Sequence, residues 1–388
     1  MKGRADMAVP KGFHVHTGKV GIAHDDRDDF AVLVSDRPAV VSGMFTKSRF
    51  AGPSVVLSRA ACRDFAARGV VVLSRNANVA TGEVGLAQAT EVRDTVAAKL
   101  GVPADEMLIA STGVIGVEYP MDSVRPALAD LAYPTGSDFA AAATAIMTTD
   151  TRPKVISLPC GDATLVGIAK GVGMIEPNMA TMLTFFCTDA DIAAPDLDRI
   201  FRAVVERTFN AVSVDTDTST SDSAAIFANG AAGPVDLAEF ERVLYDAALH
   251  LVREIASDGE GASKLIEVRV TGARDTAQAK LVGKAIVNSP LVKTAVHGGD
   301  PNWGRVAMAI GKCEDEQDID QDRVRIGFAD FEVYPNRPDA DTTAKLVKHL
   351  AGDEVLITAD LGIADGAFTV YGCDLTNGYV HINSAYTT

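Results

Sequence analysis

The 388-residue sequence is poor in the features that mark several common classes of protein. Its five cysteines are far apart, with no C-x-x-C pair and no histidine at ligand spacing, which argues against structural zinc and favours buried thiols in a reducing compartment. No apolar run reaches the roughly 18 residues that a membrane helix needs, and the N-terminus lacks a signal-peptide core. We therefore expect a cytoplasmic protein.

Basic side chains are also scarce relative to acidic ones. The 36 Lys and Arg residues stand against 52 Asp and Glu residues, which gives a net charge of −16. Binding to a phosphate backbone requires a basic surface, so we expect no nucleic-acid partner, and we expect no membrane partner either. The 47% apolar and 23% charged residues are ordinary globular values, and the length predicts two or three domains folded together.

Apolar patterns predict a mixed α/β fold. Short apolar runs typical of strands buried on both faces occur at 69–74, 107–111 and 182–188. Helices are predicted over 84–100, 195–209 and 237–255, where helix formers or one apolar stripe recur and where Gly101 or Pro195 marks an end.

Strands are expected to dominate from Lys264 onward. Alternating apolar residues over 323–333 predict a hairpin. The polar stretch 271–279 is the best candidate for a domain boundary, so we expect a larger domain over 1–275 and a smaller C-terminal α/β domain over 276–388.

The segment 170–190, KGVGMIEPNMATMLTFFCTDA, carries the most chemical information. Pro177 ends what precedes it, so Thr181 stands where a loop enters a buried strand. A threonine hydroxyl is a weak nucleophile, but a threonine at a chain terminus has its own α-amine as a base, with an ordinary pKa near 8. Attack of Thr181 on the carbonyl of Ala180 would create that terminus. From these residue types alone, a strand entrance with a polar cap remains the alternative.

The motif KGxGMIxPNMATML followed by TDA closely resembles the self-cleaving segment of the ornithine acetyltransferases, also called glutamate N-acetyltransferases. Similar blocks span almost the whole chain: RNANVATG (75–82), STGVIG (111–116), MTTDTRPK (147–154), STSD (219–222), SDGEGASK (257–264), NSPLVK (288–293), HGGDPNWGR (297–305) and the terminal 383–388. The sequence looks most like the paralogous branch found with clavulanic acid biosynthesis in actinomycetes. The implied fold is a layered α/β sandwich like that of the DmpA-type aminopeptidases.

The resemblance implies roles for individual residues. Cleavage between Ala180 and Thr181 would give chains 1–180 and 181–388, which pair as a heterotetramer (α2β2). Thr181 matches the nucleophile that becomes acetylated, while Thr112 and Gly113 match the pair that stabilises the oxyanion, each donor being worth roughly 3 kcal/mol of barrier. Positions that match substrate contacts are Thr148, Lys170, Thr181, Glu260, Asn383 and Thr388.

The implied activity is transfer of the acetyl group of N-acetylornithine to glutamate through acetyl-Thr181, in the arginine or the clavulanic acid pathway. An autoprocessed amidase or aminopeptidase is the nearest alternative, because the same acyl-enzyme forms and water replaces glutamate. An unprocessed acidic binding protein is a second alternative. The run HDDRDD at 24–29 is better explained as a solvated turn than as a metal cluster, and the glycines at 171 and 173 lack the rest of a dinucleotide fingerprint. We therefore expect no metal and no cofactor.

Overall fold

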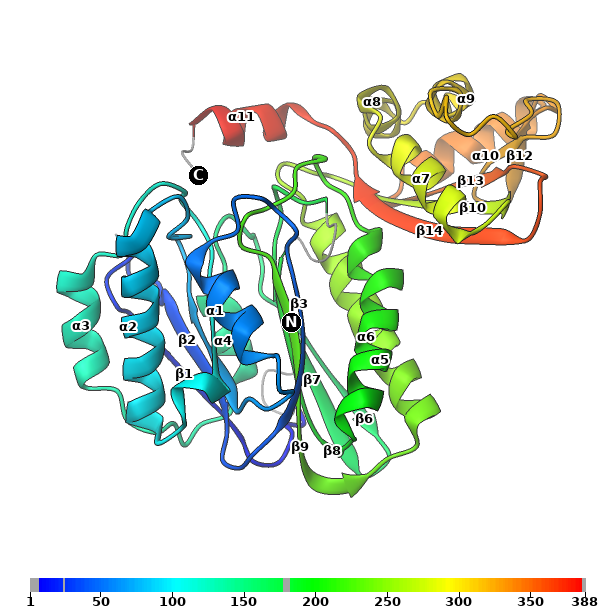
Figure 1. The fold of residues 1–388 in the computed structure, drawn as a ribbon. Helices are drawn as coiled ribbons and strands as arrows, with labels where there is room; N and C mark the ends of the chain where they lie inside the picture. Colours follow the sequence, from blue (N-terminus) through cyan, green and yellow to red (C-terminus); the bar gives the residue numbers. More distant parts are fainter. Residues whose placement is uncertain (1–6, 24, 177–181, 386–388) are drawn as a thin grey trace.

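The computed structural model describes residues 7–23, 25–176 and 182–385, which form three β-sheets with helices around them (Figure 1). The first sheet has the order β1-β2-β4-β5. Its strands are β1 (Phe13–Gly18), β2 (Phe30–Ser35), β4 (Gly69–Leu73) and β5 (Met107–Ser111). β4 and β5 are parallel, so the loops that follow them emerge at the same edge of the sheet.

Helices α2 (Gly82–Leu100) and α3 (Met121–Ala129) pack their apolar residues on the outer face of this sheet. α2 ends at Gly101, whose φ of +65° is a left-handed conformation that glycine adopts without strain. The strands predicted at 69–74 and 107–111 and the helix predicted at 84–100 are thereby confirmed. The short elements α1 (Pro53–Ala61) and η1 (Ala104–Glu106) complete this part of the chain.

The second sheet has the order β3-β9-β8-β7-β6. Its strands are β3 (Val40–Phe45), β9 (Ser223–Pro234), β8 (Leu183–Asp191), β7 (Ala163–Lys170) and β6 (Lys154–Cys160). Helices α5 (Ala194–Arg207) and α6 (Leu237–Ser257) cover its outer face, and η2 (Phe209–Ala211) follows α5. Both long helices were predicted from their apolar stripes, and the second begins at Asp236, whose carboxylate caps the Glu239 N–H.

The central strand β8 shows how the two sheets pack. Phe185 and Cys187 belong to the core shared with the first sheet and α4 (Phe139–Ala145), whereas Phe186 points to the core beneath α5 and α6. This alternation of buried side chains is that of a strand covered on both sides. The layers follow the order helix, sheet, sheet, helix in Figure 1, which confirms the predicted α/β sandwich.

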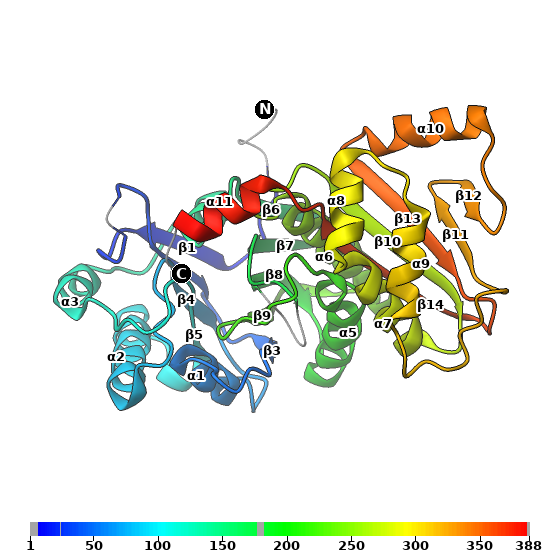
Figure 2. The same cartoon turned by 90° about the horizontal axis from the view of Figure 1, so that it is seen from above.

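The third sheet has the order β12-β11-β13-β10-β14 and forms a smaller unit (Figure 2). Its strands are β10 (Leu265–Ala273), β11 (Arg325–Phe328), β12 (Phe331–Tyr334), β13 (Glu354–Asp360) and β14 (Gly366–Cys373), so the hairpin predicted over 323–333 is confirmed. The helices after position 264 are α7 (Thr276–Val287), α8 (Pro290–Gly298), α9 (Trp303–Gly311), α10 (Ala340–Leu350) and α11 (Asn377–Ala385).

The expectation that strands dominate this part of the chain is wrong. Four of these helices are short segments that begin at a side chain capping a backbone N–H, namely Asp275, Ser289, Asn302 and Asp339. A helix of only 9 to 12 residues has about three turns, so its apolar stripe repeats few times beside the continuous β-branched runs of the strands.

Sheet membership bears on the domain division. β10 precedes position 275 but is paired between β13 and β14. We therefore propose that the C-terminal unit begins before Leu265 and not at 276. The last helix, α11, runs back from this unit over the edge of the two-sheet sandwich (Figures 1 and 2). Within the described ranges, no helix is both long and apolar enough to cross a membrane.

Candidate active site

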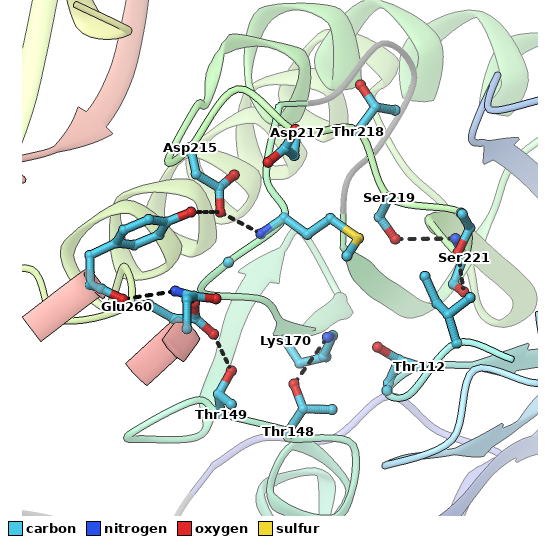
Figure 3. Close-up of a pocket in the computed structure, with 17 residues that line it drawn as sticks. Thr112, Thr148, Thr149, Lys170, Asp215, Asp217, Thr218, Ser219, Ser221 and Glu260 are labelled. Atoms are coloured by element: carbon cyan, nitrogen blue, oxygen red, sulfur yellow. Dashed lines mark hydrogen bonds between the residues drawn. The ribbon is translucent and has the colours of Figure 1, made fainter. Parts of the chain in front are cut away.

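A cavity of about 450 Å³ opens where loops from both sheets of the sandwich meet α11 (Figure 3). Its lining comes from segments far apart in the sequence: Thr112, Gly113, Ile115, Thr148, Thr149, Lys170, Gly173, Met174, Asp215, Asp217, Thr218, Ser219, Thr220, Ser221, Glu260, Tyr379 and Asn383. Six of the residues predicted from the motifs are in this set, namely Thr112, Gly113, Thr148, Lys170, Glu260 and Asn383.

The turn that carries Thr112 and Gly113 follows β5 and packs on the loop that follows β4. Gly113 has a φ of +129°, and a Cβ at this position would lie 2.1 Å from the carbonyl carbon of Arg75, so the close approach of the two loops requires glycine. The Thr112 N–H already donates to the Leu73 carbonyl at 3.1 Å. The groups of this turn suited to stabilising an oxyanion are therefore the Thr112 hydroxyl and the Gly113 N–H.

Lys170 ends β7 and directs its ammonium group into the cavity, where it donates to the Thr148 hydroxyl at 3.3 Å (Figure 3). Burial lowers the pKa of Lys170, and the negative charges of Asp150 and Asp222 partly oppose this. Among the described residues that line the cavity, Lys170 is the single basic side chain. The carboxylate of a ligand could therefore form an ion pair with Lys170.

Glu260 lies on the opposite wall. Its two carboxylate oxygens accept hydrogen bonds from the Thr149 hydroxyl and the Asn383 amide, each at 2.8 Å. A Cβ on Gly173 would lie 2.5 Å from the carboxylate, so glycine there leaves the space that Glu260 fills. A buried carboxylate held in this way is suited to binding an ammonium group.

A pair of glycines ties α11 to the Glu260 loop. Gly261 has a φ of +69°, and a Cβ at this position would lie 2.4 Å from the backbone of Gly378 and Tyr379. The Thr376 hydroxyl donates to the Gly261 carbonyl at 2.6 Å. This contact sets the start of α11 and thereby brings Asn383 to the cavity.

Replacing Gly261 with alanine is therefore expected to displace α11 and with it Asn383. The Glu260 carboxylate would then lose a charge-assisted hydrogen bond of about 1.5–3 kcal/mol, and the KM for a substrate that Glu260 binds should rise by about tenfold or more. Gly298→Ala is the matched control, because a Cβ there meets nothing within 4 Å. Steady-state kinetics of both variants check the prediction. Equal KM values for Gly261→Ala and the unaltered protein would contradict it.

The motifs assigned no role to the acidic residues of the loop 213–223. Asp215 and Asp217 line the cavity opposite Lys170, and they make the wall around Glu260 strongly acidic (Figure 3). Burial raises the pKa of Asp215, although backbone N–H groups of Ile175 and Met174 oppose the rise. The sequence signal for this loop was present: SVDTDTSTSDS is a run of polar and acidic residues without a basic partner between two buried segments.

The predicted residues Ala180, Thr181 and Thr388 lie outside the described residues. The chain resumes at Met182, whose carbonyl accepts a hydrogen bond from the Ser223 N–H at 3.0 Å. Met182 lines a recess of about 20 Å³ together with Thr112 and Lys170, which also line the main cavity. Met182 thus lies in a recess that shares residues with the cavity but is not itself part of the cavity lining.

A buried ion cluster lies behind the cavity wall. The Lys154 ammonium donates to Asp150 and Asp258, each at 2.7 Å, and all three side chains are at most 2% exposed. Asp150 also accepts the N–H groups of Gly171 at 2.8 Å and Thr148 at 3.2 Å. Through these bonds the cluster fixes the backbone beside Lys170 and under Thr148.

Nothing in the described ranges resembles a metal site: they contain no group of three or more His, Cys, Asp and Glu side chains gathered as ligands. The arrangement that is present combines hydroxyl groups, one ammonium and several carboxylates. Such a set can bind a small zwitterion and stabilise an oxyanion.

Comparison with known proteins agrees with this arrangement. The sequence profile of the ArgJ family matches residues 14–388. The chain is 66% identical to the glutamate N-acetyltransferase Oat2 of Streptomyces clavuligerus, over 98% of each chain. It is 56% identical to the arginine biosynthesis bifunctional protein ArgJ of Rhodococcoides fascians, over 99% of this chain and 96% of the other.

Solved structures are also similar, among them that of the arginine biosynthesis bifunctional protein ArgJ of Bacillus halodurans, with 39% sequence identity and a TM-score of 0.48. That match covers 51% of this chain and 96% of the other. The family profile and the full-length identities together confirm the resemblance read from the motifs: the chain belongs to the ArgJ family, the ornithine acetyltransferases.

Proposed function

We propose that the protein is a glutamate N-acetyltransferase that moves the acetyl group of N-acetylornithine to glutamate through an acetyl-Thr181 intermediate. The observation that carries the proposal is the cavity itself. A lysine, an enclosed carboxylate and a glycine turn suited to an oxyanion line it together, and Met182, which follows position 181, lies in a recess that shares Thr112 and Lys170 with it.

The names of the relatives support this activity. A protein with 66% identity over nearly the full length is a glutamate N-acetyltransferase, and one with 56% identity is a bifunctional protein of arginine biosynthesis. The substrates proposed here are those that the family resemblance implies.

Maturation would precede catalysis. The hydroxyl oxygen of Thr181 attacks the carbonyl carbon of Ala180, the carbon–nitrogen bond between the two residues breaks, and the nitrogen takes up a proton. Water then hydrolyses the resulting ester, which leaves a carboxylate on Ala180 and a free hydroxyl and α-amine on Thr181. No reactant other than water is consumed.

Transfer would then proceed in two steps. The α-amine of Thr181 takes the hydroxyl proton as the oxygen attacks the acetyl carbon, and the Thr112 hydroxyl and the Gly113 N–H stabilise the oxyanion. Collapse breaks the amide bond and releases ornithine with the transferred proton. The α-amine of glutamate attacks the acetyl ester, forms N-acetylglutamate and restores Thr181.

The charges of the cavity suit these substrates. The Lys170 ammonium would bind the α-carboxylate of either amino acid, with Thr148 beside it, and Glu260 would bind the distal ammonium of ornithine. Asn383 holds the Glu260 carboxylate in place, and we propose that Thr388 contributes from the same terminus.

We also propose that the two chains stay together after cleavage. In the second sheet, β3, β6 and β7 precede position 180, whereas β8 and β9 follow it. β8 pairs with β7 along six residues, and β9 pairs with β3 along six, so separation would require breaking both ladders. Pairing of two such units as α2β2 and a cytoplasmic location are further predictions, which sedimentation and cell fractionation would test.

The decisive experiment measures the fate of the acetyl group. Purified protein is given labelled N-acetylornithine with and without glutamate, and N-acetylglutamate and free acetate are quantified. We expect N-acetylglutamate to be the main product when glutamate is present. Acetate as the main product under that condition would overturn the transferase and favour the amidase. Growth of an arginine-requiring host that expresses the protein would indicate the arginine pathway, whereas lowered clavulanic acid production on loss of the protein in a producer would indicate the other.

A further inference from the structure

Asp215 makes two strong bonds to the chain just before the proposed cleavage site. Its carboxylate oxygens accept the Met174 and Ile175 N–H groups, each at 2.7 Å. Both bonds are charge-assisted, because two consecutive backbone N–H groups each donate to one oxygen of the same carboxylate. Residues 174–176, called here the upstream arm, end immediately before position 177.

The conformation of the upstream arm requires such an anchor. Met174 has a φ of +54°, a left-handed conformation that residues other than glycine seldom adopt. Strained backbone of this kind persists only where its surroundings hold it in place. The carboxylate of Asp215 supplies the bonds at this residue and the next.

The remainder of the upstream arm is held by the same loop. The Val214 N–H donates to the Ile175 carbonyl at 2.7 Å, and the Glu176 N–H donates to the Asp217 carbonyl at 2.9 Å. The Glu176 carboxylate accepts from the Ser213 hydroxyl at 2.6 Å and from the Asn288 amide. Every residue of the arm is therefore bonded to the segment that begins at Ser213.

The chain after the cleavage site is held as firmly. Leu183 pairs with Lys170 of β7 on one side and with Ser223 of β9 on the other, and the Met182 carbonyl is bonded to Ser223 as well. Both flanks of residues 177–181 are thus fixed to the same framework. Intramolecular attack depends steeply on how the reacting atoms are held, and a displacement of about 1 Å can cost 10²-fold in rate.

We propose that Asp215 is a positioning residue for self-cleavage: its carboxylate anchors the upstream arm so that Thr181 can reach the Ala180 carbonyl. The inference rests on the proposed self-cleavage and assigns to Asp215 a role separate from substrate binding. The other ionisable groups near Asp215 in the described part of the chain include Asp217 on its own loop, Tyr379 of α11, whose hydroxyl lies 3.5 Å away, and Cys373 at the end of β14.

The test follows conversion of freshly translated full-length chain into its two fragments on a denaturing gel. Asp215→Asn keeps the shape of the side chain but has one acceptor oxygen for two N–H groups, so we expect cleavage to slow by about tenfold or more. Asp215→Glu retains both oxygens and should restore part of the rate. Asp189→Asn is the matched control, since the two oxygens of the Asp189 carboxylate accept the Lys11 and Thr164 N–H groups near the opposite end of β8 from Leu183.

The outcomes separate this inference from the proposed function. If the unaltered chain is not cut, the self-cleavage itself is wrong. If the unaltered chain is cut and Asp215→Asn is cut at the same rate, the positioning role alone is overturned. Should Asp215→Asn fail to fold by circular dichroism, Asp215→Glu decides. It moves both oxygens by one methylene group relative to the Met174 and Ile175 N–H groups and should slow cleavage severalfold, and an unchanged rate would count against the anchor.

Discussion

Replacing Thr181 with alanine is expected to leave a single uncut chain that transfers no acetyl group. The substitution removes the only atom that attacks in both proposed reactions, so maturation and turnover fail together. Loss of a covalent nucleophile typically lowers kcat by ~10⁶-fold, which places any residual transfer below detection. The gel band of the full-length chain and an acetyl-transfer assay measure the two losses on one preparation.

Thr181→Ser is the informative control for this variant. Serine keeps the hydroxyl and, once cut, the terminal α-amine, so both reactions should persist at reduced rate. N-terminal sequencing of the second fragment should read Ser-Met-Leu in this variant and Thr-Met-Leu in the unaltered protein. A Thr181→Ala protein that is cut and active would refute the mechanism, because another residue would then have to be the nucleophile.

Much of the sandwich could be predicted because its strands are buried on both faces. The runs 69–74 and 107–111 correspond to β4 and β5, and the apolar stretch after Thr181 corresponds to β8. Parallel β4 and β5 bring the loops with Arg75 and Gly113 together at one edge. The motifs RNANVATG and STGVIG follow these two strands, and the carboxyl ends of neighbouring parallel strands lie at the same edge of a sheet, so the geometry of the sheet brings the two motifs together.

Other features depend on contacts between segments far apart in the sequence, for which one sequence has no local signal. Asp215 was missed because its partners are the N–H groups of residues 40 and more positions earlier, and a backbone group has no identity in the sequence. The tie between Gly261 and Gly378 could not be seen either, since each glycine alone is typical of a turn. The helices after 264 were missed because they are short, so that their apolar stripes repeat only a few times.

The cluster of Asp150, Lys154 and Asp258 joins two of the segments that line the cavity to the start of β6. Asp150 follows Thr149 directly, Asp258 lies two residues before Glu260, and Lys154 begins β6. Burial alone would raise the pKa of Asp150, but the charges of Lys154 and Lys170 outweigh it and hold the pKa below its ordinary value. Lys154, which is also hydrogen-bonded to Asp150, therefore acts together with Lys170 to keep this carboxylate ionised within the protein.

Lys154→Met is expected to destabilise the protein by about 3–5 kcal/mol, because it leaves two buried carboxylates without the cation they share. The loss of unfolding free energy should be largest near neutral pH and should shrink as the pH falls. In the unaltered protein the lowered pKa of Asp150 contributes stability above its unfolded pKa of about 4, and this is lost as the pH falls. In the variant, burial raises that pKa, so the penalty is largest near neutral pH and shrinks as the carboxylate becomes protonated.

The difference in unfolding free energy between the two proteins should therefore narrow between pH 7 and about pH 4, as measured by urea denaturation. Lys345→Met is the matched control, since Lys345 pairs with Asp341 in an exposed i,i+4 contact that is worth about 0.5 kcal/mol or less. A Lys154→Met protein as stable as this control at pH 7 would show that the two carboxylates do not need the cation. Because Asp150 also holds the Gly171 and Thr148 N–H groups, the variant that survives at low temperature should transfer acetyl groups more slowly, and Lys345→Met should not.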